Sequence, residues 1–97
     1  MFLEKYLKNP IHLDIIYSNY DKQYLNTLDE ENFLKIYKLF KSSNFYFIKD
    51  IILNYLEIFD LDYDTVFNKI IELKKNLGDN YINIIANDLT YLEEFLK

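Results

Sequence analysis

Hydrophobic residues recur along most of this chain with the spacing of an α-helix. In residues 32–41 the lysines at every third position form one polar stripe opposite a wide apolar face; they are Lys35, Lys38 and Lys41. In residues 63–77 and 80–96 apolar side chains again return every three or four positions. We therefore predict an all-α fold, a compact single-domain bundle of four to five short helices over residues 1–97.

Polar residues mark where these helices begin and end. Asn9, directly before a proline, predicts a capped helix start. Residues 27–30, Thr-Leu-Asp-Glu, match a capping box, and Asp62 or Asp64 can cap the helix that follows them. Residues 42–44, Ser-Ser-Asn, break the pattern between two helices. Two lysines at positions 74 and 75, followed by a glycine at position 78, predict a helix end.

Residues 11–28 allow helix, strand or loop. Residues 11–15 alternate between apolar and polar, as a half-buried strand does. A helix would instead place four residues on one side: Leu13, Ile16, Tyr17 and Tyr20. We favour the helix, because no second alternating segment offers a strand partner.

The most apolar stretch is residues 45–59. Only four residues interrupt it, and on a helical wheel they form one narrow stripe: Lys49, Asp50, Asn54 and Glu57. We expect a helix that is central in the fold or has one side against another molecule.

The final segment repeats its apolar residues along one face. These residues are Ile82, Ile85, Leu89, Leu92 and Leu96. Asp88 can cap a separate last turn, so the helix is expected to break near this residue.

Composition changes how the aromatic residues are interpreted. All eleven basic residues are lysine, and Ile, Asn, Tyr and Phe are abundant, which indicates the codon bias of an AT-rich genome. Ten Tyr and eight Phe are therefore not by themselves evidence of a binding site. A hydrophobic content of 51% and a net charge of -5 are typical of an ordinary globular domain.

The sequence also indicates a compartment. It has no cysteine, so a disulfide framework is excluded and a reducing compartment is the simplest setting. Charges interrupt residues 1–8, whereas a secretory signal needs an apolar stretch of about 7 to 15 residues. No segment reaches the roughly 18 apolar residues of a membrane helix. We expect a soluble cytoplasmic protein without a membrane partner.

Few residues could support catalysis or zinc binding. His12 is the sole histidine, and the chain has no glycine-rich phosphate loop or nucleophile motif. His12 and Asp14 supply too few ligands for a stable zinc site, which takes three or four. We expect no enzymatic activity, no cofactor and no metal.

Residues 60–64 resemble the start of a calcium-binding loop, with carboxylates at Asp60, Asp62 and Asp64. The match then fails, because Thr65 replaces the required glycine and Ile71 replaces the bidentate glutamate. We interpret this segment as a hinge that caps a helix.

Direct nucleic-acid binding is also disfavoured. Such binding relies on clustered Lys and Arg, and this chain is acidic and has no arginine. The lysine stripe in residues 32–41 is typical of a solvated helix face.

Protein recognition is the class that remains. Tyrosines can provide rigid contacts within a ring of carboxylates that attracts basic surfaces. The candidate partner-binding residues are Asp50, Tyr55, Glu57, Asp60, Asp62, Tyr63 and Asp64. They lie on the outward stripe of residues 45–59 and in the hinge after it, and Tyr46 is a further candidate anchor.

Two hypotheses follow. The first is a non-enzymatic inhibitor or immunity-like protein that blocks a basic, nucleic-acid-processing partner by placing carboxylates where phosphates would bind. The alternative is a structural or adaptor subunit that homo-oligomerises through the apolar helix 45–59. The expected oligomeric state is a monomer or homodimer. The expected partner is a protein with a basic surface.

Overall fold

The fold consists of helices. The computed structural model describes residues 2–97, and within this range it contains six α-helices, three 3-10 helices and no strand. None of these helices is both long enough and apolar enough to cross a lipid bilayer. The all-α prediction is confirmed, with more elements than expected, because two segments split and two further short helices, η1 and α2, form near the N-terminus. In chain order the elements are η1 (Phe2–Lys5), α1 (Pro10–Asn19), α2 (Lys22–Asn26), α3 (Glu30–Ser42), α4 (Ile48–Asn54), η2 (Leu56–Asp60), α5 (Tyr63–Leu77), α6 (Tyr81–Asn87) and η3 (Leu89–Leu96).

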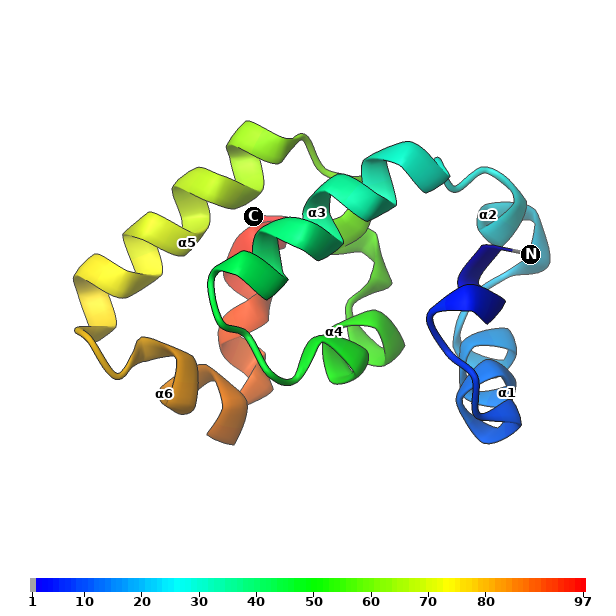
Figure 1. Cartoon of the computed structure of the whole chain (residues 1–97), viewed down its shortest axis with the longest axis horizontal. Coiled ribbons are helices and arrows are strands. Elements are labelled where there is room, and N and C mark those ends of the chain that lie inside the picture. The colour runs from blue at the N-terminus through cyan, green and yellow to red at the C-terminus, as the bar shows by residue number, and fades with distance from the viewer. Residues whose placement is uncertain (1) are drawn as a thin grey trace.

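The molecule is elongated, with principal extents of 37 × 25 × 23 Å. The N-terminal elements η1, α1 and α2 form one end, α5 and α6 form the other, and α3 and α4 lie between them (Figure 1). Residues 11–19 are helical, as favoured, and the Ile11 N–H donates to the Asn9 side chain at 3.0 Å. Ile16 is buried, but Tyr17 is 51% exposed, contrary to expectation. This end helix is covered on one side only, and Tyr17 lies about 100° around it from Ile16.

Helix α3 starts later than the predicted capping box. Asp29 is its N-cap and accepts from the Glu31 and Asn32 N–H groups, whereas the Thr27 hydroxyl donates to the Tyr24 carbonyl. The capping-box prediction was therefore wrong, because Asp29, two residues after Thr27, is the N-cap. The predicted lysine stripe on this helix is exposed, as expected.

The predicted break after α3 is confirmed and has a specific geometry. Asn44 has a φ of 71°, in the left-handed region. The Phe45 N–H then donates to the Phe40 carbonyl at 3.0 Å, and the Asn44 N–H donates to the Lys41 carbonyl at 3.1 Å. These two bonds form a Schellman motif, which turns the chain so that the Phe45 ring contacts the Phe40 ring, with centroids 5.0 Å apart.

Residues 45–59 do not form one helix. Residues 45–47 are irregular, and α4 ends at Asn54, so that Tyr55 separates it from η2. At this break the Leu56 N–H donates to the Tyr20 hydroxyl at 3.0 Å instead of continuing the helix. The expectation that the segment is central is confirmed, because eight of its apolar residues are buried: Phe45, Phe47, Ile51, Ile52, Leu53, Leu56, Ile58 and Phe59.

The last two α-helices follow the sequence signals closely. Helix α5 ends at Leu77, its C-cap is Gly78, whose φ of 85° suits glycine, and its N-cap position is Asp62. The Asp62 side chain makes no capping hydrogen bond, contrary to expectation. The break at Asp88 is confirmed, since Asp88 accepts from the Thr90 N–H and hydroxyl.

One buried position in the C-terminal segment differs from the prediction. Leu96 is 42% exposed, and Phe95 is buried instead. The reason is that η3 has three residues per turn, so the inward position after Leu92 is three residues on rather than four.

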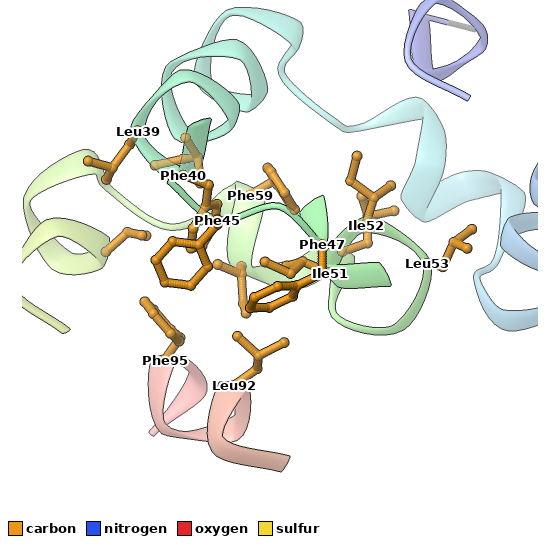
Figure 2. Packing of buried hydrophobic residues seen from close by; sticks show 14 of the residues in the cluster. Leu39, Phe40, Phe45, Phe47, Ile51, Ile52, Leu53, Phe59, Leu92 and Phe95 are labelled. Carbon is orange, nitrogen blue, oxygen red and sulfur yellow. The ribbon is translucent and has the colours of Figure 1, made fainter. Parts of the chain in front are cut away.

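A cluster of aromatic rings fills the centre of the fold. Figure 2 shows buried side chains of α3, of residues 45–59 and of η3 directed towards one core, among them Phe40, Phe45, Phe59, Leu92 and Phe95. The Phe40 ring lies 5.8 Å from that of Phe59 and 5.9 Å from that of Phe95. No polar or charged residue is buried among residues 2–97, so the carboxylates described below all lie towards the surface.

Candidate partner-binding site

The predicted partner-binding residues occupy three places in the fold. Tyr55, Glu57 and Asp60 lie at and just before η2, and Asp62, Tyr63 and Asp64 begin α5. Asp50 lies apart from this run on α4, where it lines a cavity together with Lys41 and Lys49. The structure thus keeps six of the seven residues on one continuous segment, residues 55–64.

Two tyrosines that the sequence did not single out position the carboxylates of η2. The Tyr24 hydroxyl donates to Asp60 Oδ2 at 2.6 Å, and the Tyr20 hydroxyl accepts from the Leu56 N–H. The Tyr20 and Tyr24 rings stack with centroids 5.7 Å apart. The N-terminal end of the molecule therefore holds η2 in place through contacts between residues 36 positions apart.

Burial and negative charge affect both hydroxyls. Partial burial raises the pKa of Tyr24 above its usual range, and the hydrogen bond to Asp60 raises it further. Partial burial also raises the pKa of Tyr20, with the neighbouring Glu57 as the second cause. Both phenols keep their protons in the folded chain at pH values where the unfolded chain releases them.

Stability should therefore fall at alkaline pH. The contribution of these phenols is present below the unfolded pKa of about 10 and is lost as pH rises above it. Between about pH 10 and 12 we expect the free energy of unfolding of the Tyr24→Phe variant to fall less steeply with pH than that of the wild type. The two slopes should differ by at most about 1.4 kcal/mol per pH unit, the limit for one proton. Denaturant unfolding at each pH measures this slope. Tyr17→Phe, at an exposed position, is the control, and equal slopes for Tyr24→Phe and wild type would contradict the prediction.

Tyr55 reports which carboxylates gather around η2. Burial is the first cause that raises the pKa of Tyr55, followed by the charges of Glu93, Asp88 and Glu57. Asp88 and Glu93 come from the C-terminal segment, more than thirty positions away, and only the tertiary structure brings them here. Half-buried Tyr55 is therefore affected by negative charges from two segments that are distant in the sequence.

These carboxylates have no lysine partner within the described part of the chain. The ion pairs there join Lys5 to Glu30, Lys69 to Glu72 and Lys97 to Glu94. The sequence itself has no lysine between Lys49 and Lys69. We call the carboxylates that form no ion pair with a lysine here the acidic surface. It consists of Glu57, Asp60, Asp62, Asp64, Asp88 and Glu93.

Tyr63 stands at the edge of the acidic surface and is exposed. Its ring stacks on that of Phe67, with centroids 6.1 Å apart and an interplanar angle of 13°. Tyr63, Phe67 and Ile71 are each between 42% and 50% exposed and form an apolar stripe along α5. On its other side Tyr63 borders a groove of about 310 Å³ with Lys35 and Lys38 of α3. The acidic surface thus meets the lysine stripe at this aromatic residue.

The chemistry available at this site is recognition. Unpaired carboxylates attract cations and accept hydrogen bonds, and a stacked aromatic pair offers rigid contact area. Among residues 2–97 no three His, Cys, Asp or Glu side chains converge to hold a metal ion, and this includes the run from Asp60 to Asp64. Comparison of the chain with protein-family models, curated proteins and solved structures gave no match.

Proposed function

We propose that this chain is a non-enzymatic protein-binding domain that docks on a basic surface of its partner. Its mode of action is that of an inhibitor of a nucleic-acid-processing protein, with carboxylates in the places where phosphates bind. The observation that supports this proposal is the acidic surface, six carboxylates without a lysine partner around η2 and the start of α5.

The arrangement suits an interface in three respects. Tyr24 and Tyr20 hold η2, so its carboxylates need little ordering on binding. The negative charges of the acidic surface attract a basic partner before contact. The exposed Tyr63 and Phe67 supply aromatic anchors at the edge, the residue type that often dominates binding energy.

The oligomerisation alternative has less support. It depends on apolar side chains of residues 45–59, and eight of these pack inside the monomer. The exposed apolar stripe lies on α5, next to the acidic surface. This position favours a contact that combines aromatic and charged groups over a purely apolar one.

Charge-neutralised variants test the proposal. We expect Glu57→Gln, Asp62→Asn and Asp64→Asn together to weaken capture of the native partner about 10- to 100-fold, at roughly 0.5 to 1 kcal/mol for each charge. Asp62 and Asp64 are exposed and Glu57 is partly buried. The measurement is affinity capture from the native host, identification by mass spectrometry and titration of the purified partner.

A matched control removes the same charge elsewhere. Asp14→Asn, Glu72→Gln and Asp79→Asn are exposed positions outside the acidic surface. The control should bind like the wild type. Equal losses in both triple variants would mean that only net charge matters, and unchanged binding by the first variant would refute the proposed site.

A further inference from the structure

One cavity of the structure lies away from the acidic surface. Its volume is about 530 Å³, within the range of about 300 to 1,000 Å³ that small-molecule sites occupy. It is formed by α1, α3, the irregular residues 45–47 and α4. We call it the His12 cavity, because the sole histidine of the chain lies in its wall.

Aromatic side chains form much of the wall. They are Tyr37, Phe45, Tyr46 and Phe47. The Tyr46 ring is 68% exposed, yet it is fixed, because its hydroxyl donates to Asn83 Oδ1 at 2.9 Å and its ring packs edge-on against Phe47 at 5.3 Å. A fixed, exposed ring beside other aromatic rings suits a planar ligand group.

The charges of the cavity are opposite to those of the chain as a whole. Lys41 and Lys49 line it, and neither belongs to an ion pair in the described part of the chain. Asp50 is the only carboxylate in the wall, so two lysines outnumber one acid in a chain of net charge -5.

His12 lies in the wall with one polar atom unsatisfied. Its Nδ1 is buried and has no hydrogen-bond partner among the described residues. The two lysine ammonium groups are hydrogen-bond donors suited to an oxyanion.

We propose that the His12 cavity binds a small aromatic molecule that carries an oxyanion such as phosphate or carboxylate. Lys41 and Lys49 bind the oxyanion, the ring packs against Tyr46 and Phe47, and Asp50 weakens binding by repulsion. This site shares no residue with the acidic surface, so it goes beyond the proposed function and is tested independently of it.

Phenyl phosphate is the probe, titrated into the full chain and followed by heteronuclear NMR. Saturable shift changes are expected at His12, Tyr46 and Phe47, with weaker binding of inorganic phosphate and of phenol alone. Lys41→Gln or Lys49→Gln should lower the affinity about 3- to 10-fold. Asp50→Asn should raise it, an effect in the opposite direction that general loss of structure does not produce.

Lys35→Gln and Lys38→Gln are the matched controls, since both lysines are exposed on α3 and outside the cavity. They should bind the probe like the wild type. The proposal is overturned if no saturable shift appears at about 10 mM phenyl phosphate, roughly ten times the 1 mM Kd of a weak site. It is also overturned if the Lys41 and Lys49 variants bind as tightly as the controls.

Discussion

Replacing Phe40 with alanine is expected to lower the free energy of unfolding by about 3 to 5 kcal/mol. The Phe40 side chain is fully buried, and its ring meets those of Phe45, Phe59 and Phe95 within 6 Å. Four segments of the chain meet at this point, so the cavity left by the missing ring cannot close by moving one helix. A loss of this size is a large part of the roughly 5 to 15 kcal/mol that stabilises a typical domain.

Denaturant unfolding followed by circular dichroism measures this loss. Phe67→Ala is the matched control, because the same side chain is removed from an exposed site on α5. It should change the free energy of unfolding by about 1 kcal/mol or less. A loss below about 1 kcal/mol for Phe40→Ala would contradict the described core.

Replacing Asn32 with alanine is expected to lower the free energy of unfolding by about 2 to 3 kcal/mol. The Asn32 side-chain amide donates to the Phe59 carbonyl at 2.7 Å and to the Leu61 carbonyl at 3.0 Å. It thereby ties α3 to the end of η2, and alanine leaves two partly buried carbonyls without a donor. The segment that carries Asp60 and Asp62 should also loosen, so partner binding should weaken although no charge changes.

Unfolding and partner titration of the same variant test both effects. Asn76→Ala, at an exposed position on α5, is the control and should stay within about 0.5 kcal/mol of the wild type. Wild-type stability and affinity for Asn32→Ala would show that these two hydrogen bonds do not hold the segment.

Signals that act within one turn of helix predicted structure well. The Asn9 cap, the left-handed Gly78 and the break at Asp88 follow from local hydrogen bonding and backbone preference. The periodicity of α3 located its apolar face for the same reason. On α5 the periodic apolar positions include a buried face and also the exposed stripe of Tyr63, Phe67 and Ile71, which periodicity alone did not separate. The misplaced capping box at Thr27 shows the limit, because Asp29 offers an equally local and better-placed acceptor.

The division of residues 45–59 could not be predicted from their own sequence. Tyr20, far along the chain, accepts the Leu56 N–H and so stabilises the break. The same division explains why the prediction that grouped Asp50 with Glu57 was wrong. These two residues share a stripe only if residues 45–59 form one unbroken helix. In the structure Asp50 lines the His12 cavity instead.

The candidate site was partly visible in the sequence. Four of its carboxylates were named from the sequence, because they lie on the outward stripe of residues 45–59 and in the hinge after it: Glu57, Asp60, Asp62 and Asp64. Asp88 and Glu93 were missed, as was the role of Tyr24, because each reaches the site through contacts between distant segments. No periodicity or motif signals such contacts.

The salt dependence of partner binding tests the central claim most directly. Calorimetric titration of the captured partner from about 0.05 to about 0.5 M salt should show affinity falling steadily, because attraction between exposed opposite charges is screened over this range. The Glu57→Gln, Asp62→Asn, Asp64→Asn variant should start weaker and depend less on salt. Affinity that is constant with salt, or the same in both proteins, would contradict recognition through the acidic surface.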